Sequence, residues 1–394
     1  MAIQYLDKLN LKGKRALIRV DYNVPYDKSM NITDDTRITA TLPTLKYCIE
    51  NGASLVLVSH LGRPDGKPVP SMSLAPVARR LAELLGREVK FFDEPIGEAL
   101  KARVDALKAG EVALLENIRF YPEEEKNDDG FGKWLASLCD VYINDAFAAA
   151  HRGHASNEAV TRHVKECAAG FLLEHEIEYF RKAMVEPAKP VTAIIGGVKI
   201  STKIEALKNI IKKVDYLIIG GGMAFTFFKA KDVAIGKSLL EKDHVSTARE
   251  ILDLAKQHKV EIVLPVDVVV APGLDSPDKK KIVPIDQIPD DMAGLDVGPK
   301  TVELYGSIIR KSKTIVWNGP LGAFETSAFA EGTNAVARIV GDSGALSVIG
   351  GGDSVSAINQ SGYAEKMSYI STGGGAFLEL LEGKTLPAIA ALDK

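Results

Sequence analysis

The sequence has 394 residues, of which 46% are hydrophobic and 26% are charged, and its net charge is −3. This composition excludes a disordered chain, a collagen and a small disulfide-held scaffold, and the length favours two or three domains. The balance of 49 Lys and Arg against 52 Asp and Glu gives no sign of a nucleic-acid or membrane partner, so any basic site has to be a local cluster.

In the first half of the chain, short β-branched runs alternate with longer amphipathic stretches. The predicted strands are 16–20, 54–59, 89–92, 111–115 and 141–144. Helices are predicted between them, for example over 36–50, which is followed by Asn51 and Gly52, and over 74–85, which is followed by Gly86. Glycine commonly follows the last turn of a helix, so these positions mark two helix ends.

The second half of the chain repeats this alternation. Its predicted strands are 191–195, 216–219, 262–266, 314–317, 346–349 and 369–370. These runs are continuously apolar, as expected for parallel strands that are covered on both faces. The two halves together predict an α/β protein with two doubly wound parallel-sheet (Rossmann-like) domains.

The stretch 172–185, which is followed by Pro187 and Pro190, is the predicted boundary between the domains. Its regularly spaced charges fit a solvated connecting helix and fit an ordinary surface helix of one domain equally well. We expect a first domain over 1–170, a connecting hinge helix over 171–186 and a second domain over 187–379.

Four predicted strands of the second half run directly into glycine, at 196–197, 220–222, 350–352 and 373–375. In a parallel sheet these turns share the carboxyl edge, where backbone N–H groups and helix N-termini can approach phosphate oxygens. One such turn is often only structural, but four favour a phosphate-rich ligand. The P-loop pattern fails because Lys231 replaces its first glycine, and the dinucleotide and protein-kinase motifs are missing from the sequence.

Two polar features adjoin these glycines. Asp353 directly follows Gly352, which suits a carboxylate ligand of Mg²⁺ on a polyphosphate, although an N-cap of a helix over 354–359 is an alternative. Lys199 and Lys203 lie four residues apart after Gly197, on one face of the expected helix. Lysines in a first helical turn oppose the helix dipole, so their placement favours a bound anion.

In the first half, the ends of the predicted strands carry cations instead of glycines. Parallel strands would bring one set of side chains together at the carboxyl edge: Asp21, His60, Arg63, Arg119 and Arg152. Arg37 lies at the start of the helix over 36–50. Guanidinium groups bind carboxylate and phosphate in bidentate fashion, so this set predicts a site for a small phosphorylated acid. His151 and His154 are too few to predict a metal site.

Eight segments along nearly the whole chain resemble the motifs of the phosphoglycerate kinase family. They are RVDYNVP at 19–25, TDDTRI at 33–38, SHLGRP at 59–64, LENIRFYPEEEKND at 115–128, NDAFAAAHRGHAS at 144–156, VWNGPLGAFE at 316–325, GGGDS at 350–354 and STGGGA at 371–376. The resemblance implies phosphoryl transfer from 1,3-bisphosphoglycerate to MgADP, giving 3-phosphoglycerate and MgATP. It also implies a monomer in which residues from about 380 to 394 return to the first domain.

The resemblance further implies the site residues. The acid site corresponds to Asp21, Tyr22, Asn23, Arg37, His60, Leu61, Gly62, Arg63, Arg119 and Arg152. The nucleotide site corresponds to Lys203, Gly220, Gly221, Gly222, Gly294, Asn318, Glu325, Gly351, Gly352, Asp353 and Ser354, with Glu325 on the ribose hydroxyls and Asp353 on Mg²⁺. The groups expected to catalyse transfer are Arg37, Lys199 and the N–H groups of Gly373, Gly374 and Gly375. Thr202 departs from the family pattern, in which an acid commonly precedes the second lysine, so this loop is one negative charge short.

Such a reaction needs no general base, because the attacking carboxylate is already ionised at pH 7. Catalysis then depends on positioning the substrates and on neutralising charge on the transferred phosphoryl group. If each domain holds one substrate, the domains have to close to bring the substrates together. The alternatives are a non-catalytic phosphometabolite-binding protein, which would lack Arg37, Lys199 or the glycines at 373–375, and a P-loop-type ATPase, which Lys231 disfavours. The three widely spaced cysteines and the start of the sequence, which has no apolar leader, predict a cytoplasmic protein.

Overall fold

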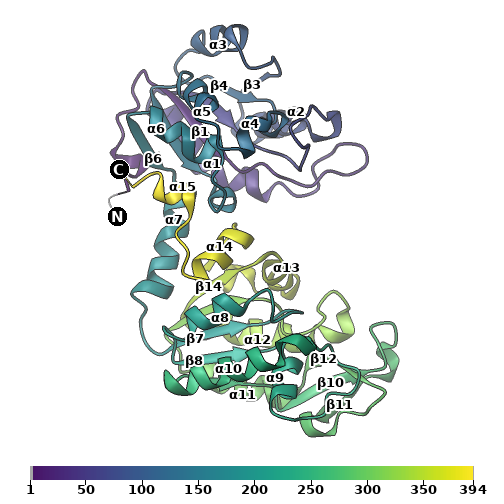
Figure 1. The fold of residues 1–394 in the computed structure, drawn as a ribbon. Helices are drawn as coiled ribbons and strands as arrows, with labels where there is room; N and C mark the ends of the chain where they lie inside the picture. The colour runs from purple at the N-terminus through teal and green to yellow at the C-terminus, as the bar shows by residue number, and fades with distance from the viewer. Residues whose placement is uncertain (1–2, 394) are drawn as a thin grey trace. The chain divides into compact units, whose positions relative to one another are not determined.

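The computed structural model describes residues 3–393, and the chain divides into two compact units (Figure 1). Unit 1 comprises Met1–Ile177 and Thr385–Lys394, and unit 2 comprises Glu178–Lys384. The C-terminal helix α15 (Pro387–Ala390) belongs to unit 1, where Ala388 N donates a hydrogen bond of 3.1 Å to Ala150 O.

Unit 1 is built on a six-stranded parallel sheet with the order β3-β4-β2-β1-β5-β6. Its strands are β1 Arg15–Val20, β2 Ser54–Val58, β3 Val89–Phe92, β4 Val112–Leu115, β5 Val141–Asp145 and β6 Glu166–Ala169. The first five confirm the predicted strands to within one residue at each end. The strand β6 was not predicted because its sequence, ECAA, is short and contains no β-branched residue.

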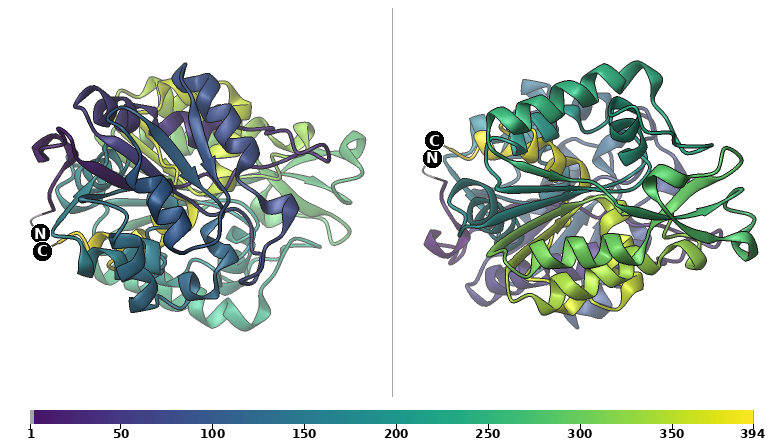
Figure 2. Two further views of the ribbon diagram at one scale, coloured as in Figure 1. Left: turned by 90° about the horizontal axis from the view of Figure 1, so that it is seen from above. Right: turned by 90° about the horizontal axis from the view of Figure 1, so that it is seen from below.

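Helices cover both faces of this sheet (Figure 2, left). On one face, α1 (Thr36–Glu50) and α2 (Ala75–Leu85) share a buried core with the apolar side chains of β1 and β2. On the other face, α5 (Asp129–Ala136) packs with α6 (Val160–His163) and with the π-helical turn η5 (Ala155–Ala159). The remaining segments are α3 Glu98–Asp105, α4 Pro122–Glu125 and the 3-10 turns η1 Leu6–Lys8, η2 Pro70–Met72, η3 Ile118–Phe120 and η4 Phe147–Ala149.

Unit 2 is built on a second six-stranded parallel sheet with the order β15-β14-β13-β7-β8-β9. Its strands are β7 Val191–Ile195, β8 Tyr216–Ile219, β9 Glu261–Val263, β13 Thr314–Asn318, β14 Leu346–Gly350 and β15 Tyr369–Ile370. All six were predicted, but β9 ends earlier than expected, two residues before Pro265, which cannot donate to a strand ladder. The chain order reverses between β7 and β13, and such switch points are where open α/β sheets bind ligands.

Helices also cover both faces of the unit 2 sheet (Figure 2, right). One layer contains α8 Ile204–Ile210, α9 Ala224–Ala230 and α10 Val245–Gln257, and the other contains α11 Pro299–Ile309, α12 Glu331–Asp342 and α13 Gly352–Ser361. The helix α14 (Gly374–Leu381) packs against α8. The 3-10 turns are η7 Lys242–His244, η8 Pro277–Lys279, η9 Ile285–Gln287, η10 Ser327–Phe329 and η11 Ala364–Lys366.

Unit 2 also contains a three-stranded antiparallel sheet that was not predicted. Its strands are β10 Asp267–Ala271, β11 Lys281–Pro284 and β12 Ala293–Val297, in the order β11-β10-β12. The sequences of β11 (KIVP) and β12 (AGLDV) contain Lys, Pro, Gly and Asp, which are depleted in strands. Here tertiary packing overrides the local preference.

The stretch predicted as one connecting helix has two parts, α7 (Phe171–Phe180) and the π-helical turn η6 (Arg181–Val185). The division between the units falls after Ile177, within α7. Leu173 and Glu176 are buried, so this helix is not a uniformly solvated connector. No helix within residues 3–393 is both long and apolar enough to cross a membrane.

Candidate functional site

In unit 1, hydrogen bonds join the loops that follow β1, β2 and β4. Asn23 Oδ1 accepts from Gly62 N at 3.0 Å, and Asn117, which is fully buried, binds both backbone groups of Leu61. Tyr22 is fully buried in the same edge. The predicted residues Tyr22, Asn23, Leu61 and Gly62 therefore hold this edge together, with Asn117 as a further member that the motif did not single out.

Arg37, in the first turn of α1, forms an ion pair with Asp21. Arg37 Nη1 lies 3.0 Å from each carboxylate oxygen of Asp21. Burial alone would raise the pKa of Asp21, but the charges of Arg37 and Arg19 and the backbone hydrogen bond from Asn23 help to hold this pKa below its ordinary value. The Arg37 side chain remains 37% exposed, so its other N–H groups are accessible to an anion.

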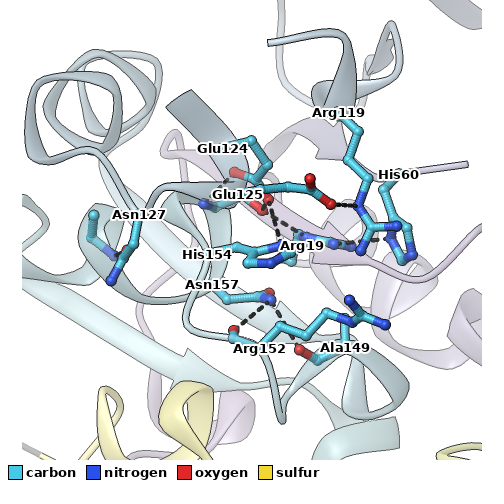
Figure 3. Close-up of polar contacts among 12 residues, drawn as sticks. Arg19, His60, Arg119, Glu124, Glu125, Asn127, Ala149, Arg152, His154 and Asn157 are labelled. Carbon is cyan, nitrogen blue, oxygen red and sulfur yellow. Dashed lines mark hydrogen bonds and ion pairs between the residues drawn. The ribbon is translucent and has the colours of Figure 1, made fainter. Parts of the chain in front are cut away.

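Arg19, which sequence reasoning missed, lies within the unit 1 cluster (Figure 3). Its side chain is buried, and its Nη2 lies 3.1 Å from His60 Nδ1. Burial lowers the pKa of His60 well below its ordinary value, against the opposing charge of Asp21. The available signal was an arginine between the apolar residues Ile18 and Val20 of strand β1. These two neighbours face the α1–α2 core, and Arg19 points to the opposite face.

Arg119 and His154 also belong to this cluster (Figure 3). Arg119 is 3% exposed; its Nη1 donates to Gly62 O at 2.8 Å, while its Nη2 is buried without a hydrogen-bond partner among the described residues. Burial and the charges of Arg152 and Arg19 lower the pKa of Arg119 to about 10. Burial likewise lowers the pKa of His154 to about 3. A bound anion would satisfy the free Arg119 donor and compensate these crowded cations.

The structure therefore brings together most of the predicted cationic set and its carboxylate. These residues are Asp21, Arg37, His60, Arg119 and Arg152. Arg63 is exposed, and within residues 3–393 its guanidinium has neither a hydrogen bond nor an ion pair to the others.

Unit 2 contains a cavity of about 340 Å³ at the carboxyl ends of its strands. Five of the predicted residues line it: Gly221, Gly222, Gly294, Glu325 and Asp353. Apolar side chains that sequence reasoning missed form much of the remaining wall: Phe225, Leu239, Val268, Leu274 and Leu321. Leu239 and Leu274 are 56% and 51% exposed, and a flat apolar ligand would cover them.

One glycine of this cavity is required by close packing. A Cβ at Gly294 would lie 2.1 Å from the ring of Phe225. Any larger residue would displace Phe225, which itself lines the cavity. Gly294 therefore shapes the wall without presenting a side chain to it.

Lys199 and Lys203 do not share a helix face, contrary to the prediction. Residues 198–200 are irregular, 201–203 form a turn, and α8 begins only at Ile204. Within this segment, Thr202 Oγ1 donates to Lys199 O at 3.0 Å and Lys203 N donates to Ile200 O at 2.8 Å, which gives the backbone an alternative to helix. Lys199 is exposed.

Lys203 points to the end of β13. Its Nζ lies 3.0 Å from Asn318 O and 2.6 Å from Asn318 Oδ1. Burial lowers the pKa of Lys203 to about 8, against the opposing charge of Asp353. The half-buried Lys203 and the buried Asn318 therefore form one polar pair at the switch point of the sheet.

The glycine-rich segment after β14 leads into α13. Asn318 Nδ2 donates to Gly350 O at 2.8 Å, and Ser354 Oγ accepts from Gly319 N, so the ends of β13 and β14 are tied together. Asp353 is exposed in the first turn of α13, and the N-cap position is Gly351, at φ +98°. The alternative interpretation of Asp353 as an N-cap is therefore wrong.

The N-termini of α13 and α14 lie side by side. Gly373 is the N-cap residue of α14, and a Cβ at Gly374 would lie 3.2 Å from Gly352 N. Two helix N-termini in contact present several backbone N–H groups and two positive dipole ends at one place. The exposed Asp353 carboxylate beside them fits Mg²⁺, which takes one or two carboxylates and otherwise keeps water and phosphate ligands.

Comparison with known proteins identifies the family. The family model described as phosphoglycerate kinase matches residues 6–384. A phosphoglycerate kinase of Syntrophobacter fumaroxidans is 53% identical over 387 residues, which cover 98% of each chain. The chain belongs to the phosphoglycerate kinase family. Among solved phosphoglycerate kinase structures, the one from Coxiella burnetii has 43% identity and a TM-score of 0.93 and covers 99% of each chain.

A second solved phosphoglycerate kinase, from Pyrococcus horikoshii, is 34% identical, with a TM-score of 0.85 over 99% of this chain and 98% of that one. The predicted family, the two-sheet α/β fold and the phosphotransferase class are therefore confirmed. The alternative of a non-catalytic phosphometabolite-binding protein is not favoured.

Proposed function

We propose that unit 1 binds 3-phosphoglycerate or 1,3-bisphosphoglycerate, that unit 2 binds ATP or ADP with Mg²⁺, and that phosphoryl transfer between them follows the family reaction. The observation that carries this proposal is the buried cation cluster of unit 1, in which one N–H group of Arg119 is buried without a partner in the described chain. A phosphate or carboxylate oxygen would accept from that donor and reduce the repulsion among the cations.

In unit 1, Arg119, Arg152 and His60 are the proposed ligands of the acid's anionic groups, and the free guanidinium of Arg63 joins them. Arg37 is proposed to contact the carboxyl end of the acid, where phosphoryl transfer occurs. It is partly exposed, and its ion pair with Asp21 holds it in place. Asp21 holds Arg37, and Asn23 holds the neighbouring loop through Gly62 N. The site can therefore orient an anion before any chemistry occurs.

In unit 2, the apolar cavity wall suits a nucleobase and the adjoining glycines suit phosphates. Glu325 lines the cavity and is the proposed acceptor for the ribose hydroxyls. The Gly220–Gly222 turn, the N-terminus of α13 and the Lys203–Asn318 pair are the proposed phosphate contacts. Asp353 is the residue that would hold Mg²⁺, which supplies charge neutralisation on the phosphate oxygens when bound.

The chain's own groups account for the remaining chemistry. A carboxylate of the acid attacks as an anion, so no residue has to remove a proton. Arg37, Lys199 and the N–H groups of Gly373, Gly374 and Gly375 are the proposed stabilisers of charge on the phosphoryl group in transfer. An arginine in this role contributes roughly 10³–10⁵ in rate in phosphoryl-transfer enzymes. The proposal therefore needs residues of both units.

A coupled assay with ATP and 3-phosphoglycerate, with and without Mg²⁺, tests this function. We expect turnover that requires both substrates and the metal. ATP hydrolysis that is independent of 3-phosphoglycerate would instead support an ATPase. Calorimetric binding of 3-phosphoglycerate without turnover would support a binding protein.

The oligomeric state and the compartment are further parts of the proposal. We propose a monomer, tested by sedimentation at several protein concentrations. Action in the cytoplasm is supported by Cys48, Cys139 and Cys167, all of which carry free thiols.

A further inference from the structure

Four buried side chains of unit 1 form a continuous chain of hydrogen bonds. Glu124, in the short helix α4, accepts from Ser156 N at 2.8 Å and from Ser156 Oγ at 2.6 Å. Ser156 Oγ accepts from Arg19 Nε at 2.9 Å, and Arg19 Nη2 lies 3.1 Å from His60 Nδ1. Glu124 is fully buried, and the other three residues are at most 5% exposed. Figure 3 shows Glu124, Arg19 and His60 along this path.

The donors and acceptors of this chain fit together in only one way. Arg19 has no acceptor atom, so His60 Nδ1 has to accept its N–H. Ser156 has one hydroxyl proton, which goes to Glu124 because Arg19 already donates to the same oxygen. A protonated His60 would place an N–H against an N–H of Arg19. The ring is therefore neutral, and its single proton lies on Nε2.

The charge of Glu124 explains why Arg19 can stay in this position. Arg19 lies near the cation Arg119, and the two guanidinium groups repel each other. Glu124 is the middle residue of a run of three glutamates and the buried one, whereas Glu123 and Glu125 are exposed. Burial raises the pKa of Glu124, but the charges of Arg19 and Arg119 and the two hydrogen bonds from Ser156 oppose this shift and favour the ionised carboxylate.

We propose that Glu124 and Ser156 are positioning residues that act through Arg19 to hold His60 in its neutral Nε2–H form, as a hydrogen-bond donor to the acid substrate. This inference rests on the proposed function of unit 1. Within the described residues, the His60 side chain forms its hydrogen bond at Nδ1. The Nε2 proton is therefore available to an oxygen of the acid.

A merely structural role would have different consequences. Glu124 also ties α4 to η5, so its loss could loosen unit 1 as a whole and change stability and both substrates together. The proposed role confines the change to the tautomer of His60 and to the affinity for the acid. Two measurements separate these possibilities.

The first measurement uses the unaltered protein. Nitrogen-15 NMR of protein labelled at histidine, with the His60 signals identified by their loss in His60→Gln, reports which ring nitrogen carries the proton. We expect a proton on Nε2 and none on Nδ1 at neutral pH. An Nδ1–H tautomer or an imidazolium would overturn the proposal without reference to any variant's folding.

The second measurement uses Ser156→Ala, which removes one oxygen, and Glu124→Gln, which removes the charge. We expect both variants to give a mixture of His60 tautomers and to raise the KM for 3-phosphoglycerate about tenfold, the effect of losing one charge-assisted hydrogen bond. The KM for ATP should stay within about twofold. The matched controls are Glu123→Gln on the same helix and the exposed Ser137→Ala, which should leave both KM values and the tautomer unchanged.

The outcomes also separate this inference from the proposed function. If the unaltered protein fails to bind 3-phosphoglycerate in a calorimeter, the proposed function of unit 1 is wrong, and the tautomer measurement still tests the hydrogen-bond chain. If it binds but Ser156→Ala and Glu124→Gln keep its KM and tautomer, only the positioning role is wrong. Equal rises in both KM values with a lower melting temperature would show a structural role and would also overturn the inference.

Discussion

The candidate site of unit 1 consists mainly of charged side chains, whereas that of unit 2 consists mainly of backbone and apolar surface. In unit 1, Arg19, Arg119 and Glu124 are all at most 3% exposed and depend on one another for hydrogen bonds and charge balance. In unit 2, glycines surround an apolar cavity, and Lys203 contributes a half-buried cation whose hydrogen bonds go to Asn318. Anion binding should therefore depend on individual side chains in unit 1 and on backbone access in unit 2.

The largest expected effect concerns the residues proposed to act on the phosphoryl group from each unit. Arg37→Ala and Lys199→Ala should each lower kcat by roughly 10³-fold and change the KM values far less, because these groups act mainly in the transition state. The double variant should lose much less than the product of the two losses. Steady-state kinetics gives kcat and KM for the single and double variants, and calorimetric titration gives their substrate affinities.

The controls for this pair are Lys46→Ala, on the exposed face of α1, and Lys212→Ala, exposed in unit 2. Both should keep full activity. If Lys199→Ala retains near-normal turnover, or if the two losses multiply fully, the shared role is wrong.

The next effect separates the side-chain site from the backbone site. Arg119→Ala should raise the KM for 3-phosphoglycerate by about 100-fold, because it removes a buried charged donor, and should leave the KM for ATP nearly unchanged. Arg63→Ala should act in the same direction but more weakly, since Arg63 is exposed. Initial-rate kinetics with each substrate varied in turn gives both constants.

Arg162→Ala is the matched control. Arg162 is a half-exposed arginine of unit 1 that forms ion pairs with Asp129 and Glu158 and is not one of the proposed ligands of the acid. It should change neither KM. Equal effects of Arg119→Ala on both substrates would contradict the assignment of the acid to unit 1.

Most of the fold could be predicted because its parallel strands are short, apolar and β-branched, and because glycines or charged residues follow them. The strands β11 and β12 escaped prediction because Lys281, Pro284 and Gly294 lie within them or at their ends, and pairing with β10 makes them strands. The strand β10 was also missed, although its three consecutive valines are typical of a strand. The turns before Ile204 escaped because their hydrogen bonds compete with a helix that the spacing of the two lysines suggested.

The sites were predicted less completely than the fold, for a related reason. Residues that directly follow strands, such as Asp21 and His60, could be placed at one sheet edge from topology alone. Arg19 lies inside a strand, and Glu124 lies inside a run of similar glutamates. Their connection through hydrogen bonds to Ser156 depends on packing between segments that are distant in the sequence, so it could not be predicted. Leu239 and Leu274 carry no sequence signal for a cavity wall because exposed leucines are common.

Asp353 is one of the few charged side chains in the unit 2 site, and its replacement should have the third-largest effect. Asp353→Asn should raise the Mg²⁺ concentration needed for half-maximal activity by roughly 30-fold, because it removes the proposed carboxylate ligand. The affinity for 3-phosphoglycerate should not change. Activity titrated with Mg²⁺ measures this, with the exposed Asp342→Asn on α12 as control. An unchanged Mg²⁺ requirement would remove Asp353 from the metal site.

A smaller effect tests the backbone site directly. Nothing lies within 4 Å of a Cβ built at Gly352, and its φ is not positive, so Gly352→Ala should keep the melting temperature. The added methyl would stand at the N-terminus of α13, where phosphate is proposed to bind, and should raise the KM for ATP about tenfold by blocking backbone contacts. Gly351→Ala is the contrasting variant, because φ is +98° and the Cβ would lie 2.8 Å from Asn318 Nδ2, so it should also lower the melting temperature. A normal KM for ATP in Gly352→Ala would place the phosphates elsewhere.

The smallest expected effect follows from Lys203, the half-buried lysine that contacts Asn318 in unit 2. Burial lowers its pKa to about 8, so the unliganded chain loses this charge as the pH rises through 8. Binding a polyphosphate favours the protonated form, and the affinity for ATP should therefore fall with rising pH, by about fourfold between pH 7 and 8.5 for a single ionisation at that value. Calorimetric titration of ATP at constant ionic strength measures how the affinity depends on pH.

Lys203→Met should bind ATP more weakly, and its affinity should not decline with rising pH. Lys208→Met, which removes a half-exposed lysine of α8, should keep the decline. If the affinity of Lys203→Met for ATP still declines with rising pH, another group is responsible for the pH dependence. The phosphates would then bind to the backbone groups of the unit 2 site without a contribution from Lys203.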